Sequence, residues 1–159
     1  MSKYIRIIIA WLMVLASILM IFFFSSKNGE ESGELSNGTL ENIVGSFVEE
    51  ERVPEVVDKL HTPFRKIAHF GIYMLLGFSL SCAFILSIPL KPLLSCAFAL
   101  GSGVIYALID EFVFQQITSG RGPSIVDALV YDGLGVLTGA FVYFVFNYFN
   151  SRYIIKNRN

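Results

Sequence analysis

Four long apolar stretches dominate the chain, at about residues 4–24, 64–88, 90–114 and 125–149. Each is long enough to cross a lipid bilayer as a helix, which takes about 20 residues. Short turns join the last three stretches, whereas residues 25–62 form a long polar connection between the first two. The pattern predicts an all-α protein: an integral membrane four-helix bundle in one domain over residues 1–159, with a basic tail at 150–159.

The connection at 25–62 contains one amphipathic segment. Its apolar residues recur at helical spacing, at Leu40, Ile43, Val44, Phe47 and Val48. Two interpretations are open: a short surface helix resting at the headgroup level, or a lid over the outer ends of the spans. Farther on, Thr62-Pro63 predicts the start of the second membrane helix, because Thr caps helices well and Pro suits the first helical position.

Composition supports a membrane location. Of 159 residues, 54% are hydrophobic and 16% are charged, whereas soluble domains carry about 25% charged residues. The net charge of −1 gives no basis for nucleic-acid binding. Cys82 and Cys96 lie inside apolar stretches and are interpreted as packing residues. The first stretch is too long for a signal peptide and no Ala-x-Ala site follows it, so it is interpreted as an uncleaved helix.

An even number of spans puts both termini on one side of the membrane. The charged residues beside the termini and in the turn between the second and third spans are all basic: Lys3, Arg6, Lys91, Arg152, Lys156 and Arg158. The long first connection is instead rich in Glu. The positive-inside tendency therefore predicts a multi-pass protein of the cell membrane, with both termini in the cytoplasm and an extracytoplasmic first loop.

Asp110 and Glu111 interrupt the third apolar stretch near its end. Adjacent carboxylates are costly near lipid, so they must face partners or water. Asp110 lies about 30 Å along the helix from Leu90, at the same level as His69 on the second helix. It shares a helix face with Tyr106, whereas Glu111 is turned away by about 100°. Asp110 is therefore the stronger candidate to face the bundle.

The second helix begins with a polar stripe. Arg65, Lys66, His69 and Tyr73 fall within an arc of about 100° at its outer end. Snorkelling to headgroups would account for the two basic residues, and an aromatic belt for the tyrosine. His69 is interpreted either as a packing residue or as an acid–base group, because histidine titrates near neutral pH.

The fourth helix adds two further carboxylates. Asp132 shares a side with Gly135 and Gly139, a spacing typical of close helix packing, so Asp132 is expected to face the bundle. Asp127 follows Ser124 at capping-box spacing and is interpreted as reaching back to the helix start.

Taken in order, these polar residues resemble the pattern of the VanZ-like family, named for a protein associated with teicoplanin resistance. The resemblance covers about residues 5–146, and its pieces are Phe24-Ser25-Ser26, Arg65-Lys66-x-x-His69-Phe70-x-x-Tyr73, Asp110-Glu111-x-x-x-Gln115/Gln116, Gly120-Arg121, Asp127, Asp132, Gly135 and Gly139. It implies that the polar residues line one site. The family usually spaces the two polar residues of its last helix four apart. Here Asp127 and Asp132 are five apart, so both can reach the site only through a loose first turn or a bulge.

The resemblance also implies a protein of the bacterial cell envelope that affects teicoplanin susceptibility. As an enzyme it would act on a lipid-linked substrate, with His69 and Asp110 or Glu111 performing acid–base chemistry. Arg65, Lys66 and Arg121 would hold an anionic headgroup. The further substrate-binding candidates are Tyr73, Gln115, Gln116, Asp127, Asp132, Ser25 and Ser26. Two alternatives stay open: a non-catalytic binder of an envelope component, and a structural charge network.

The expected partners are membrane lipids and a lipid-linked cell-wall precursor, with no nucleic acid. No cofactor is predicted. A hard cation would suit the carboxylates, but nothing in their spacing demands a metal. A coupled-ion transporter is disfavoured, because neither inverted repeats nor broken helices are evident in the sequence.

Overall fold

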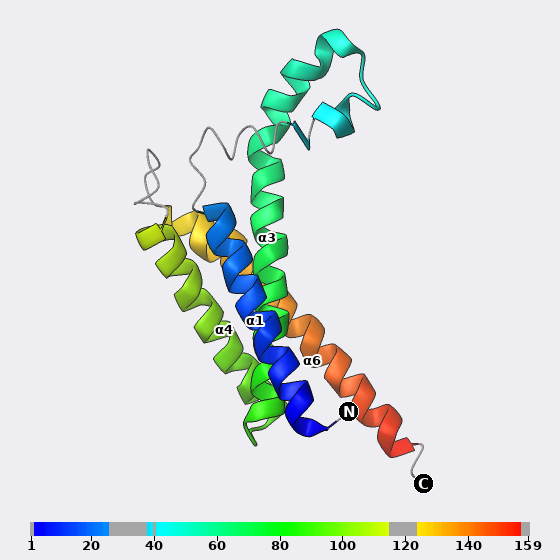
Figure 1. Cartoon of the computed structure of the whole chain (residues 1–159), viewed down its shortest axis with the longest axis vertical. Helices are drawn as coiled ribbons and strands as arrows, with labels where there is room; N and C mark the ends of the chain where they lie inside the picture. Colours follow the sequence, from blue (N-terminus) through cyan, green and yellow to red (C-terminus); the bar gives the residue numbers. More distant parts are fainter. Residues whose placement is uncertain (1, 26–37, 40, 115–123, 157–159) are drawn as a thin grey trace.

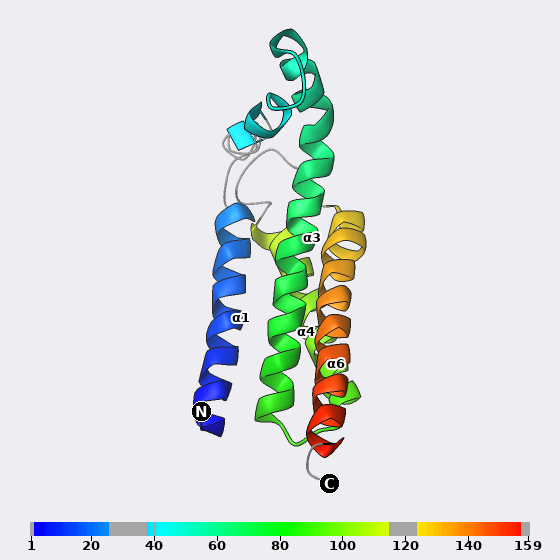
Figure 2. The same cartoon turned by 90° about the vertical axis from the view of Figure 1, so that its right-hand side faces the viewer.

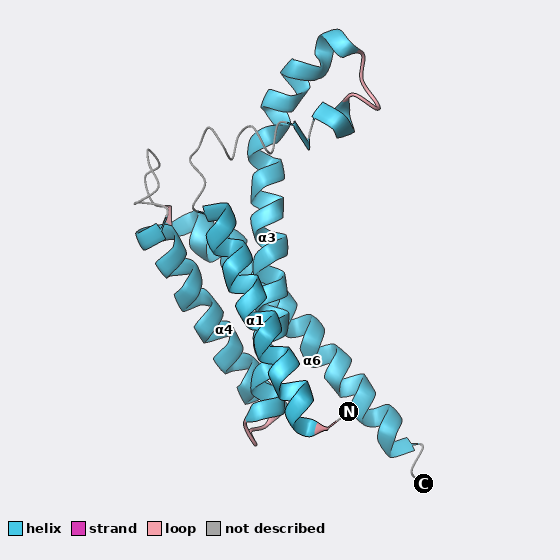
Figure 3. Ribbon diagram, in the orientation of Figure 1, coloured by secondary structure: helices cyan, strands magenta, loops and turns pink. Residues whose placement is uncertain are grey.

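The computed structural model describes residues 2–25, 38–39, 41–114 and 124–156 (Figure 1). Its elements are the α-helices α1 (Lys3–Ser25), α3 (Val53–Ser87), α4 (Pro92–Ile109) and α6 (Gly133–Lys156), the 3₁₀-helix η1 (Glu50–Arg52), and the π-helices η2 (Asp110–Phe114) and η3 (Asp127–Asp132). No strand occurs within these ranges (Figure 3). The predicted all-α fold is confirmed.

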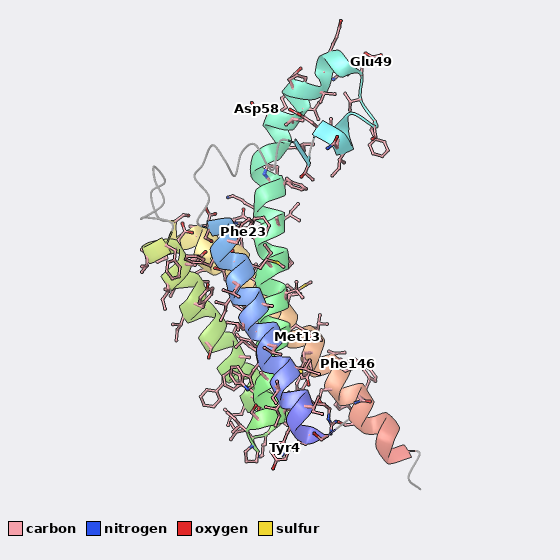
Figure 4. All side chains as sticks on the ribbon, in the orientation of Figure 1. Tyr4, Met13, Phe23, Glu49, Asp58 and Phe146 are labelled. Carbon is pink, nitrogen blue, oxygen red and sulfur yellow. The ribbon has the colours of Figure 1, made fainter. Side chains whose placement is uncertain are left out.

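Four stretches are long and apolar enough to cross a membrane: Lys3–Ser25, Lys66–Ser87, Pro92–Phe114 and Asp127–Ser151. They coincide with the predicted spans to within a few residues. Large apolar side chains cover the outside of the bundle, as Figure 4 shows along α1 from Tyr4 through Met13 to Phe23. Such a surface suits contact with lipid. The last helix continues to Lys156, so the tail predicted to begin at residue 150 is largely helical.

α3 is the central helix, because it packs against α1, α4 and α6 (Figure 2). Glycines let α3 and α6 approach until their backbones touch. A Cβ added to Gly139 would collide with the carbonyl oxygen of Met74, and one added to Gly77 would collide with that of Val136. The predicted Gly135-x-x-x-Gly139 packing motif is confirmed, since a Cβ on Gly135 would lie 2.6 Å from the Phe70 carbonyl oxygen.

The predicted start of the second helix is wrong. α3 begins at Val53, ten residues earlier, and runs through Pro63 without ending. Pro54, not Pro63, occupies the first turn, where a missing N–H costs nothing. At 1.5 Å per residue, the 35 residues of α3 extend about 52 Å, of which the membrane-spanning part takes about 33 Å. Residues 53–65 therefore form a stalk about 20 Å long.

The stalk projects at the end of the bundle opposite both chain termini, which we call the far end (Figures 1 and 2). Figure 4 labels Asp58 midway along the stalk and Glu49 beside its outer end. Local packing explains why helix continues there. Val57 of the stalk is buried against Val44, and the partly buried residues around this pair are Val48, Val53, Val56 and Phe64.

The amphipathic segment buries only part of its predicted apolar face. Residues 41–44 are helical, and Val44 and Val48 pack on the stalk. Ile43 is exposed and Phe47 is 86% exposed, because the chain turns at residues 45–47. Leu40 lies outside the described residues. The buried part of this face is thus covered by the stalk of α3. It does not rest on lipid headgroups, as a surface helix would, or on the outer ends of the spans, as a lid would.

The close α3–α6 contact predicts unequal effects for two glycine substitutions. Gly139→Ala should lower the free energy of unfolding by roughly 1–3 kcal/mol, because backbone atoms must move apart. Gly101→Ala on α4 is the matched control, since a Cβ there meets no atom within 4 Å. It should be neutral or stabilise the helix by roughly 0.5–1 kcal/mol. Thermal unfolding in detergent micelles measures both, and equal melting temperatures would contradict the packing.

Candidate functional site

Polar side chains gather at the far end of the bundle, on the two π-helices and on the helix ends beside them. η2 and η3 contain i→i+5 turns, a rare widening that often marks functional sites. On a regular α-helix, Asp127 and Asp132 would point about 140° apart. The wider turns of η3 bring both carboxylates to α3, where Asp127 meets Lys66 and Asp132 meets His69. The five-residue spacing is therefore resolved by a bulge.

Asp110 joins three helices. It starts η2 and is completely buried, and its Oδ2 accepts hydrogen bonds from Ser25 Oγ of α1 at 2.7 Å and from Tyr73 OH of α3 at 3.1 Å. Hydrogen bonds to a charged group are among the strong ones, and they offset part of the cost of burying the carboxylate. One turn before Asp110, Tyr106 OH donates to the Ile18 carbonyl oxygen of α1 at 3.3 Å.

Glu111 has a different task from its neighbour. Its Oε1 accepts the backbone N–H of Ser124 at 2.7 Å, and Ser124 Oγ accepts the backbone N–H of Asp127 at 3.2 Å. Together these bonds cap the start of the last membrane helix. The predicted capping box is therefore half right: Ser124 Oγ accepts the Asp127 N–H, but the Asp127 carboxylate does not reach back to the helix start. The Glu111 carboxylate accepts the Ser124 N–H instead, and the Asp127 carboxylate pairs with the Lys66 ammonium.

His69 lies between Asp132 and Tyr73. Its Nδ1 is 3.7 Å from Asp132 Oδ1, and its ring stacks on that of Tyr73 with centroids 6.4 Å apart. Asp132 is buried and His69 is mostly buried. The imidazole thus connects one carboxylate, Asp132, with the tyrosine that binds the other, Asp110.

Lys66 forms the exposed edge of the site. Its Nζ lies 3.2 Å from Asp127 Oδ1 and 4.3 Å from the centroid of the Tyr131 ring. The two side chains of the ion pair are 35% and 36% exposed. An ion pair this open is held weakly and can exchange partners. The site therefore passes from an open pair, through the His69–Asp132 pair, to the fully buried Asp110.

All eight predicted site residues whose side chains are described lie at this one end. They are Ser25, Lys66, His69, Tyr73, Asp110, Glu111, Asp127 and Asp132. Ser26, Gln115, Gln116 and Arg121 lie outside the described residues, as does the side chain of Arg65. Sequence reasoning missed Tyr131, since an aromatic residue in an apolar stretch carries no signal of a cation contact. In the described part of the chain, no three His, Cys, Asp or Glu residues are grouped to hold a metal ion.

The fold and site together define a multi-pass helical membrane protein with a buried polar cluster at one end of its spans. Residues 8–147, nearly the whole chain, match the family described as VanZ/LLP1. The chain belongs to the VanZ/LLP1 family. Comparison with curated proteins and with solved structures gave no match.

The junction at Asp110 predicts unequal effects for two serines of α1. Ser25→Ala removes a bond to a buried carboxylate and should destabilise the protein by roughly 1–3 kcal/mol. Ser17→Ala is the control, because Ser17 Oγ bonds only the Met13 carbonyl oxygen of its own helix, and its loss should cost less than about 1 kcal/mol. The free energy of unfolding in detergent reports both. A Ser17 effect as large as that of Ser25 would count against the junction.

Proposed function

We propose that this protein binds the anionic headgroup of a lipid-linked cell-envelope molecule in the polar cluster at the far end. The far end faces the outside of the cell in this proposal, with both termini in the cytoplasm. The positive-inside tendency supports this orientation, because the charged residues near the termini are basic. Membership of the VanZ/LLP1 family supports a role in the cell envelope, and we include an effect on teicoplanin susceptibility.

The observation that carries the proposal is the gradient of burial across the cluster. Lys66 and Asp127 are open to the surroundings, while Asp132 and Asp110 lie behind them in the bundle. Ionisable residues inside membrane proteins are expensive and usually serve a function. A phosphate or carboxylate would approach Lys66 from the open side. Arg65 and Arg121 are the further basic candidates by their positions in the chain, with Ser26, Gln115 and Gln116 as polar ones.

We assign proton transfer, if the bound molecule is also modified, to His69. An imidazole beside a carboxylate can take up and release a proton near neutral pH. Asp132, 3.7 Å away, would stabilise the protonated form. Asp110 and Glu111 fit a positioning role better, since the first accepts bonds from Ser25 and Tyr73 and the second caps the last helix.

A structural charge network is the second candidate for part of the cluster. The bonds of Asp110 to two other helices favour it, because such a residue fixes how helices pack whatever the site binds. This explanation covers Asp110 and Glu111. It does not account for the open Lys66–Asp127 pair, since exposed ion pairs contribute little to stability.

Teicoplanin susceptibility of cells expressing the protein tests the proposal. Arg121→Ala should abolish any protection against teicoplanin, because the bound headgroup loses a bidentate partner. His69→Gln separates the two modes of action: it should abolish protection by an enzyme and preserve protection by a binder. His61→Gln is the matched control, since His61 is the chain's only other histidine and lies in the stalk, about 12 Å farther along α3.

Membrane levels of each variant are measured by immunoblot, so that a loss of protection is not a loss of protein. Protection that survives both Arg121→Ala and His69→Gln would contradict the proposed site. Protection that is lost equally in the His61→Gln control would contradict it as well.

A further inference from the structure

A groove runs along the outside of α3 next to the polar cluster. It has a volume of about 330 Å³ and is lined by Pro63, Lys66, Ile67, Phe70 and Tyr131. Four of these residues occupy positions i, i+3, i+4 and i+7 of α3, so they form one strip along the helix. The strip is about 10 Å long, from Pro63 to Phe70. Tyr131 of η3 forms the facing wall.

The groove lies at the edge of the membrane-spanning region. We place Pro63 at the headgroup level and Phe70 about one turn inside, because Lys66 begins the stretch of α3 that is long and apolar enough to cross a membrane. Ile67 is 69% exposed, which leaves the groove open sideways, toward the lipid. The part of the groove beside Ile67 and Phe70 is therefore apolar and faces the bilayer.

One charged group stands in the wall of this apolar groove. The Lys66 ammonium lies over the Tyr131 ring and contacts Asp127, and about a third of the side chain is exposed. A phosphate in the groove can accept a hydrogen bond from it without breaking a buried bond. The Lys66 ammonium beside an apolar groove complements a molecule with an anionic head and a hydrocarbon chain.

We propose that this groove binds a phosphate-bearing membrane lipid, with the phosphate at Lys66 and the start of one chain along Ile67 and Phe70. The volume accommodates roughly ten groups the size of a water molecule, which suits a phosphate and the first part of a chain but not a whole lipid. The rest of the lipid stays in the bilayer.

The inference rests on the proposed function and narrows it. Lys66 lines the groove and also holds Asp127, and His69 follows one turn later with Asp132, so a headgroup at Lys66 borders the polar cluster. The bound molecule is then a membrane-anchored phosphate that enters sideways from the leaflet. A water-soluble molecule would instead enter from the far end.

Lipid binding to the full-length protein in detergent, followed by native mass spectrometry, tests the groove. The probes are phosphatidylglycerol and a diacylglycerol with the same chains, which lacks the phosphate. Ile67→Trp should weaken phosphatidylglycerol binding by about tenfold, because the larger ring fills the groove. Ile105→Trp is the matched control: Ile105 is 60% exposed, on α4, and lines neither the groove nor the cluster. It should bind like the unmodified protein.

Lys66→Gln is the second variant and should reduce phosphatidylglycerol binding to the level of diacylglycerol. Excess inorganic phosphate tests for a site that binds phosphate alone. Inorganic phosphate would displace the ligand from such a site whatever hydrocarbon chains the ligand carries. Equal binding by Ile67→Trp and Ile105→Trp would overturn the proposal, as would equal binding of the two lipids by the unmodified protein.

The two proposals fail separately. If Ile67→Trp binds lipid normally while Arg121→Ala abolishes teicoplanin protection, the proposed function stands and the groove is wrong. If Ile67→Trp loses the lipid while protection survives in Arg121→Ala and His69→Gln, the groove stands and the proposed function is wrong.

Discussion

A carboxylate buried at the end of a membrane bundle must be hydrogen-bonded, and the far end of this protein is arranged around that requirement. Asp110 is completely buried, and Ser25 and Tyr73 reach it from two other helices. Leaving such a group without partners would cost more than each bond contributes by itself. The polar contacts of Asp110 therefore fix how the far ends of α1, α3 and η2 meet.

The other contacts at this end build on the same junction. Tyr73 also stacks on His69, so the position of the imidazole is linked to Asp110. The π-turns of η3 then place Asp132 beside His69 and Asp127 beside Lys66. Lower in the bundle, glycine contacts such as Gly139 against Met74 hold α3 and α6 together. Small residues thus pack the spans closely, while polar bonds specify how their far ends meet.

The spans and the level of the polar residues could be predicted from sequence, because hydropathy and helical rise are local properties. Asp110 and His69 were expected at one level on that basis. The start of α3 could not be predicted, since Pro54 and Pro63 both suit a first helical turn and only the packing of Val44 on Val57 decides between them. The five-residue spacing of Asp127 and Asp132 pointed to a loose first turn or a bulge, but it could not identify Lys66 as the partner of Asp127, because that contact depends on how the π-turns of η3 pack on α3.

A double-mutant cycle tests most directly whether Asp110 is the junction of the far end. The free energy of unfolding in detergent is measured for the unmodified protein, Asp110→Leu, Tyr73→Phe and the double variant. Asp110→Leu leaves the buried Tyr73 hydroxyl without its acceptor, and Tyr73→Phe removes that hydroxyl. The double variant should therefore be less destabilised than the sum of the single variants, by roughly 0.5–3 kcal/mol. Strictly additive effects would contradict the account.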